Sequence, residues 1–169
     1  MIQTVLSEIE AVLDRVEEPD VAVLLDAPRI FVTGEGRSGF MARAFAMRLM
    51  HLGLPVHVIG ETVTPPLHPG DLLVALSGSG TTETTVRHAQ RAENVLAVTS
   101  DPESPLAQLA DTVWHIPAAT KYARSGTIQP LSSLFDQCAH IVLDVACLRI
   151  AQAKDIDNAR AVAAHANTE

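Results

Sequence analysis

DLLVALSGSGTTE (residues 71–83) is the stretch that decides the fold, because it joins an apolar run to a Ser/Gly loop. The run over residues 72–76 has no polar interruption, which is typical of a strand covered on both faces. Two glycines and four small hydroxyl residues follow, at or near the start of a segment with helical character. Glycine permits a sharp turn and a close approach to a ligand, and a helix start offers free N–H groups and partial positive charge. We therefore predict a strand, a loop and a helix that together cradle a phosphate monoester.

The same stretch differs from the two common nucleotide-binding loops. No lysine follows its glycines, as the ATP and GTP phosphate loop requires, and it contains no G-x-G-x-x-G pattern. A plain Ser/Gly turn with a helix cap is the alternative explanation of these residues.

A second strand, glycine loop and helix occur earlier in the chain. Residues 29–33 (RIFVT) predict a strand, residues 34–39 (GEGRSG) a loop, and residues 40–52 a helix. Ser38 occupies the expected N-cap position of this helix, where its hydroxyl could cap the helix, bind a ligand or do both. The loop formally matches the dinucleotide fingerprint, but the next predicted strand ends at residues 59–60 without an acidic residue, so we discount that match.

The remaining segments continue the alternation of strands and helices. Helices are predicted over residues 1–26 (interrupted at Pro19), 82–92, 105–110, 131–150 and 154–164, strands over 55–59, 95–99 and 112–116, and an irregular loop over 122–130. This order predicts an α/β fold: a doubly wound, five-stranded parallel sheet in the order 2-1-3-4-5, with helices on both faces. We expect one domain over residues 1–169, with a helical arm at 1–26 and a C-terminal helix and tail at 154–169. In such a sheet the first and third strands end beside the ligand-binding switch point, where both glycine loops would meet.

Composition narrows the classes of partner and location. The chain has 169 residues, of which 47% are hydrophobic and 4% aromatic, with a formal charge of −8 and no basic run. Nucleic acid and acidic membrane surfaces are therefore not expected as partners. No apolar run reaches transmembrane length and no signal-peptide pattern is present. Cys138 and Cys147 are nine residues apart, which predicts opposite faces of a helix and no local disulfide, so we expect a cytoplasmic protein.

Two acidic residues are candidates for chemistry. Glu61 follows a predicted strand, at the edge where doubly wound sheets place ligand groups, although a solvated loop carboxylate is the simpler explanation. Asp136 lies near the start of the long helix over residues 131–150 and shares a face with His140. The seven histidines show no metal-ligand spacing, so we predict no metal site.

Five segments resemble the 6-phospho-3-hexuloisomerase family of the sugar-isomerase (SIS) domain superfamily. They are GEGRSGFMARAFAMRLMHLG, VIGETVTPPL, DLLVALSGSGTTE, TIQPLSSLFDQ and HANTE, and they occur in the family's order over nearly the whole chain. The resemblance implies interconversion of 3-hexulose 6-phosphate and fructose 6-phosphate in the ribulose monophosphate pathway, with no metal or cofactor. It also implies a homo-oligomer, typically a tetramer, whose active sites are shared between subunits.

The resemblance further implies roles for individual residues. Four hydroxyl residues fall at the phosphate-binding positions: Ser38, Ser77, Ser79 and Thr82. Four more loop residues are candidates for contact with substrate: Gly36, Arg37, Gly78 and Gly80. For catalysis we expect Asp136 to be the base that moves the carbon-bound proton, with Glu61 as the second candidate. His165, from a neighbouring subunit, is expected to shuttle hydroxyl protons.

Three positions depart from the family pattern. Asp136 stands where the family usually has glutamate, Ser132 replaces a glycine, and Ala164 replaces a basic residue before His165. Aspartate is one methylene shorter, and a displacement of about 1 Å can cost on the order of a hundredfold in rate.

Two other functions are compatible with the superfamily. One is a different phosphosugar aldose–ketose isomerase, and the other is a non-catalytic sensor that binds a sugar phosphate. Sensors of this kind usually carry a DNA-binding domain, for which this chain has no basic helix. The retained carboxylates and His165 favour an enzyme.

Overall fold

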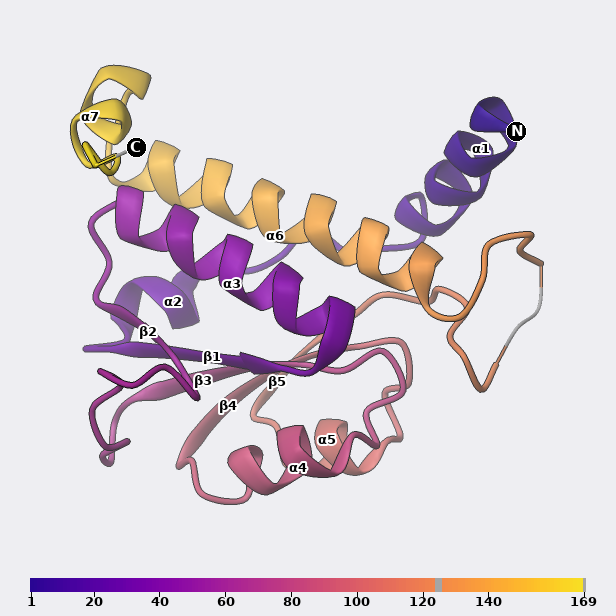
Figure 1. Ribbon diagram of the computed structural model, residues 1–169, viewed down its shortest axis with the longest axis horizontal. Coiled ribbons are helices and arrows are strands. Elements are labelled where there is room, and N and C mark those ends of the chain that lie inside the picture. Colours follow the sequence, from indigo (N-terminus) through magenta and orange to yellow (C-terminus); the bar gives the residue numbers. More distant parts are fainter. Residues whose placement is uncertain (124–125, 169) are drawn as a thin grey trace.

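The computed structural model describes residues 1–123 and 126–168 and shows the predicted alternation of strands and helices (Figure 1). The strands are β1 (Ile30–Gly34), β2 (Val56–Val58), β3 (Leu72–Leu76), β4 (Asn94–Thr99) and β5 (Thr112–His115). The helices are α1 (Ile2–Leu13), α2 (Ala22–Asp26), α3 (Gly36–His51), α4 (Glu83–Ala89), α5 (Pro105–Gln108), α6 (Ser133–Ala153) and α7 (Asn158–Ala163). The predicted loop over residues 122–130 contains residues 124 and 125, which lie outside the described residues.

The sheet has the predicted topology. Its five strands pair in parallel in the order β2-β1-β3-β4-β5. Gly34, the last residue of β1, lies opposite Leu76, the last residue of β3. The loops that follow these two strands therefore start side by side at the carboxyl edge of the sheet, as the sequence predicts.

Alternate residues of each strand face two separate hydrophobic layers. Ile30, Val32 and Val74 pack with the helices on one face, which are α1, α2, α3 and α6. Phe31 and Leu73 pack on the other face with α4 and α5 (Figure 1). Burial on both faces explains why the strand segments are apolar throughout rather than alternating.

The start of α3 corrects one prediction. This helix begins at Gly36, not at residue 40, so Ser38 lies inside its first turn and is not the N-cap. Gly36 has a φ of 57°, which turns the chain directly from strand into helix. Gly39 permits the close contact that results, because a Cβ atom there would lie 2.6 Å from the carbonyl oxygen of Gly34.

The long helix α6 buries only part of its apolar residues. Ile141 and Leu148 are 38% and 63% exposed. Cys138 and Cys147 are both buried in the same core cluster and are free, so they do not divide between an inner and an outer face.

The edge strand β5 carries the chain's single tryptophan. Trp114 is 7% exposed, and its indole Nε1 has no hydrogen-bond partner among the described residues. Across residues 1–123 and 126–168, no helix combines the length and apolar character that crossing a membrane demands.

Candidate active site

The β3–α4 loop holds its hydroxyl groups in pairs. Ser77 is buried, and its Oγ lies 3.0 Å from Oγ1 of Thr82, while Ser79 Oγ lies 2.8 Å from Oγ1 of Thr81. Thr82 is the N-cap residue of α4, yet its side chain accepts no hydrogen bond from the first turn. A side-chain cap therefore does not explain this sequence. The loop offers hydroxyl donors beside the first backbone N–H groups of α4, which have no partner within the helix, and this combination suits an anion.

Asp136 is the buried carboxylate of the site. It lies in the first turn of α6, and only 2% of its surface is exposed. Ser38 donates a hydrogen bond of 2.9 Å to Oδ1, and Nε of Arg37 lies 3.3 Å from Oδ2. Burial raises the pKa of the Asp136 carboxyl above its ordinary value, while the hydrogen bond from Ser38 and the charge of Arg37 act to lower it. The contacts join the first turn of α3 to the start of α6.

Gly78 allows the β3–α4 loop to reach the start of α6, next to Asp136. A Cβ atom at Gly78 would lie 3.0 Å from the aromatic ring of Phe135, the residue before Asp136. The absence of a side chain thus lets the β3–α4 loop lie directly against the start of α6. Three chain segments far apart in sequence, which carry Ser38, Ser77 and Asp136, therefore meet at one edge of the sheet.

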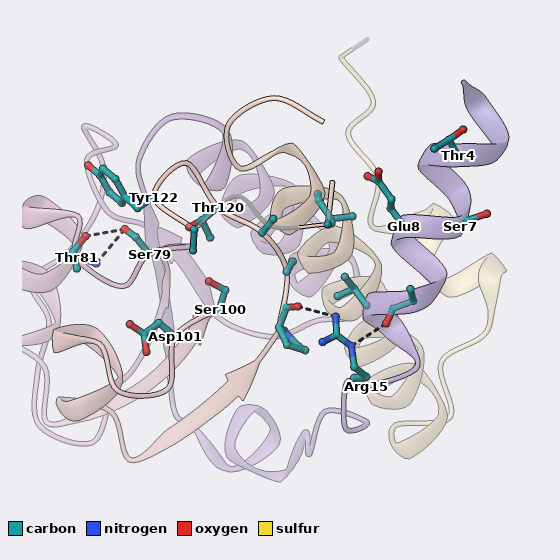
Figure 2. A pocket seen from close by; sticks show the side chains of 18 residues that line it. Thr4, Ser7, Glu8, Arg15, Ser79, Thr81, Ser100, Asp101, Thr120 and Tyr122 are labelled. Carbon is teal, nitrogen blue, oxygen red and sulfur yellow. Dashed lines mark hydrogen bonds between the residues drawn. The ribbon is translucent and has the colours of Figure 1, made fainter. Parts of the chain in front are cut away.

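A cavity of about 820 Å³ opens beside this junction (Figure 2). Ser79 and Thr81 lie on one side of it, and α1 lies on the opposite side with Glu8 and Arg15 (Figure 2). Polar residues that sequence reasoning did not identify complete the lining: Thr4, Ser7, Ser100, Asp101, Thr120 and Tyr122. Ser100 and Asp101 follow β4, so the rule that located Ser77 could also have found them. No sequence signal indicates that α1 covers the cavity.

Two predicted catalytic residues do not approach Asp136 within this chain. Glu61 lies beyond the edge strand β2, where its Oε1 is 3.5 Å from Nε of Arg43 and its side chain is 53% exposed. The His165 ring stacks on His51 at a centroid distance of 5.1 Å. His51 ends α3, whereas Arg37 lies in its first turn, roughly 20 Å away at 1.5 Å per residue. The role of His165 from a neighbouring subunit stays a prediction.

The predicted substrate-contacting glycines have structural reasons of their own. Gly36 makes the turn into α3, as described above. Gly80 has a φ of 63°, and a Cβ atom there would lie 1.9 Å from Oγ of Ser104. Packing against the start of α5 thus accounts for Gly80. Among the described residues, no group of three or more His, Cys, Asp or Glu side chains is arranged to hold a metal ion.

Comparison with known proteins identifies the family. The model of the SIS domain matches residues 23–143, which is more than half of the chain. The chain belongs to the SIS domain family. Among its relatives, the 3-hexulose-6-phosphate isomerase of Bacillus subtilis is 40% identical over 153 residues, covering 86% of this chain and 83% of the relative. The 3-hexulose-6-phosphate isomerase of Mycobacterium gastri is 40% identical over 178 aligned residues, covering 99% of this chain and 89% of that one.

Solved structures of SIS domain proteins have the same architecture. The crystal structure of a hypothetical protein matches with a TM-score of 0.88 and 34% identity, over 99% of this chain and 95% of that chain. A Methanococcus jannaschii protein, for which a molecular function of 3-hexulose-6-phosphate isomerase was inferred, matches with a TM-score of 0.79. It is 28% identical, and the match covers 99% of this chain and 96% of that chain.

Proposed function

We propose that this SIS domain protein is an isomerase that interconverts 3-hexulose 6-phosphate and fructose 6-phosphate through an enediolate. The observation that carries the proposal is the buried carboxylate of Asp136, held between Ser38 and Arg37 where the two glycine loops meet. The names of the relatives at 40% identity support the same substrate. We place the reaction in the ribulose monophosphate pathway, in accordance with the resemblance described above.

The chemistry requires one base and a stabilised oxyanion. Conversion of the 3-ketose into the 2-ketose removes the proton from C2, which gives an enediolate shared by C2 and C3. Asp136 takes this proton as a carboxylate and returns it to C3, while the hydroxyl proton on the C2 oxygen moves to the C3 oxygen. A raised pKa brings the base nearer to the working pH, which favours both transfers. Arg37, 58% exposed beside Asp136, supplies positive charge to the enediolate oxygen.

The phosphate stays unchanged in the reaction and serves to orient the sugar. Ser77, Ser79 and Thr82 would bind it once they exchange the hydrogen bonds that pair their hydroxyls for bonds to phosphate oxygens. Ser38 lies in the first turn of α3 and touches Asp136, so it would link the phosphate subsite to the base. The adjoining cavity has room for the sugar chain.

We further propose a homo-oligomer, a tetramer by resemblance, whose subunits share active sites. Support comes from apolar residues exposed on the α3 and α6 layer: Phe40, Met47, Met50, Ile141 and Leu148. The exposed α7 and the residues after it would carry His165 to a neighbour, where it shuttles hydroxyl protons. A cytoplasmic location suits the two free cysteines.

A coupled assay with 3-hexulose 6-phosphate tests the proposal. The wild-type protein should form fructose 6-phosphate, and Asp136→Asn should lower kcat by about a hundredfold or more. The same variant should lose exchange of the carbon-bound proton with deuterated water. Turnover of an aldose phosphate alone would indicate a different isomerase, and binding without turnover would indicate a sensor. If Glu61→Gln loses turnover while Asp136→Asn keeps it, Glu61 is the base.

A further inference from the structure

We infer that Glu8 is a positioning residue of this active site, an inference that rests on the proposed isomerase function. Glu8 lies on α1, outside every motif considered above, and among the described residues no hydrogen bond or ion pair joins its side chain to Asp136 or to the β3–α4 loop. Its carboxylate instead holds the end of the connection between β5 and α6, and thereby sets where α6 begins and where Asp136 lies.

The contacts of Glu8 are unusually complete for a side chain on a helix that is mostly exposed. Oε2 accepts a hydrogen bond of 2.6 Å from Oγ1 of Thr127 and one of 3.0 Å from Nε2 of Gln129. Oε1 accepts a hydrogen bond of 2.9 Å from the backbone N–H of Ile128. The three bonds lower the pKa of the Glu8 carboxyl, that from Thr127 most of all. One carboxylate thus binds three consecutive residues.

The held segment leads directly into the catalytic helix. Gln129 is buried, and the N–H of Ser133, the first residue of α6, donates to the carbonyl of Pro130. Leu131 lies between them with a φ of 54°, a left-handed conformation that is strained for a residue with a side chain. Such a conformation persists only when its surroundings fix it, and the bonds from Glu8 provide one of those constraints.

Two further hydrogen bonds confine the same connection. Nη2 of Arg15, which lies two residues beyond the end of α1, donates a hydrogen bond of 3.1 Å to the carbonyl oxygen of Pro117 just after β5 (Figure 2). The N–H of Lys121 donates 3.1 Å to Oγ of Ser132 beside the start of α6. The connection is therefore attached near its beginning to the turn after α1 and near its end to α1 itself. Of these two attachments, the one made by Glu8 lies next to the strained turn at Leu131 that precedes Asp136.

The test compares three variants of the full-length protein. Glu8→Ala removes all three bonds, and Glu8→Gln keeps an acceptor oxygen for Ile128. Glu10→Ala alters an exposed carboxylate on the same helix that makes no hydrogen bond or ion pair with any described residue. We expect Glu8→Ala to lower kcat about 10- to 100-fold, because a displacement of about 1 Å is that costly. Glu8→Gln should lie between Glu8→Ala and the wild type, and Glu10→Ala should match the wild type.

Two additional measurements separate positioning from loss of structure. Sulfate binding should be unchanged in Glu8→Ala, because the hydroxyls proposed to bind it lie on another element. Amide exchange at Ile128 should accelerate while exchange in β3 stays the same. Thr127→Val should lower kcat less than Glu8→Ala does and add little to it in the double variant.

The outcomes are distinct. Wild-type kcat in Glu8→Ala, or a fall that matches its loss of folded protein, would overturn the inference. Wild-type protein without isomerase activity would instead overturn the proposed function. In that case unchanged exchange at Ile128 in Glu8→Ala would show separately that Glu8 does not hold the connection.

Discussion

The surroundings of Asp136 oppose its charge. The carboxyl is buried, and Ser38 and Arg37 offset only part of the lost hydration, so its pKa in the folded protein is raised. Folding therefore favours the protonated form. The stability contributed by this group is fully present below the pKa of the unfolded chain and is lost as the pH rises through the folded pKa. Near neutral pH the ionised carboxylate destabilises the fold, as is common for groups placed for catalysis.

Asp136→Asn should consequently stabilise the protein near neutral pH. The amide keeps the size of the carboxylate and an acceptor for Ser38 but carries no charge to bury. We expect a higher midpoint of thermal unfolding than in the wild type, with a difference that shrinks as the pH falls. Circular dichroism melts between about pH 4 and 8 measure this, since ordinary carboxyl pKa values lie near 4. Glu17→Gln, at an exposed position, is the control, and a lower midpoint for Asp136→Asn at neutral pH would contradict the expectation.

The residues of the site differ in how visible they are in the sequence. Ser77 and Asp136 could be located because a strand end and a motif mark them. Glu8 could not be located in this way, because nothing in the sequence distinguishes it from Glu10 on the same amphipathic helix. Only the tertiary fold brings residues 127–129 to Glu8. The proposed role of His165 does not follow from a single chain for a related reason: the group on which it would act lies on another subunit.

At the scale of elements, the conformation of the β3–α4 loop depends on Gly80. Gly80 and Gly53 both have positive φ values, of 63° and 73°. An added Cβ atom at Gly53 would meet nothing within 4 Å, whereas at Gly80 it would overlap Ser104. Substitution of the two glycines by alanine therefore distinguishes the cost of backbone strain, present at both, from the cost of steric overlap, present at Gly80 alone.

Gly80→Ala should destabilise the protein more than Gly53→Ala does. We expect Gly53→Ala to lower the free energy of unfolding by about 1 kcal/mol, the cost of a left-handed residue with a side chain. Gly80→Ala should lower it by a further ~1–3 kcal/mol because Ser104 and the start of α5 must move. Urea denaturation of both variants provides the comparison. Equal losses would mean that the α5 contact yields without cost.

The elements themselves were largely predictable because both periodicity and burial on two faces leave clear patterns. The predicted helix boundary was wrong where glycine is compatible with both a loop and a helix: residues 34–39 resemble a loop, yet Gly36 and Gly39 belong to α3. Helix periodicity alone does not identify the core face of α6, because apolar residues recur both toward the core and toward the exposed face that holds Leu148. A pattern of apolar residues does not show whether they are covered by the protein's own core or by another subunit.

For the whole molecule, that exposed face predicts association. Residues 45–52 divide between core and surface: Phe45, Leu49 and Leu52 belong to the core, whereas Met47 and Met50 are exposed. With Phe40 and Leu148 they give the α3 and α6 layer apolar surface that association would cover.

Leu148→Asp should weaken the proposed oligomer. A carboxylate in an interface between copies would be buried without a partner, so sedimentation at low micromolar concentration should show smaller species than the wild type. Leu109→Asp, 39% exposed on the opposite layer at the end of α5, is the control and should not change the assembly. A wild-type protein that is monomeric and active would refute both the interface and the shared site.

The buried indole of Trp114 gives the molecule an optical signal of its own. A single tryptophan shielded from water emits at shorter wavelength than one in solvent, and no second tryptophan complicates its spectrum. Because Trp114 lies on the edge strand β5, its emission reports whether that strand is still attached to the sheet. The effect of every substitution above on folding can thus be followed by fluorescence without adding a label.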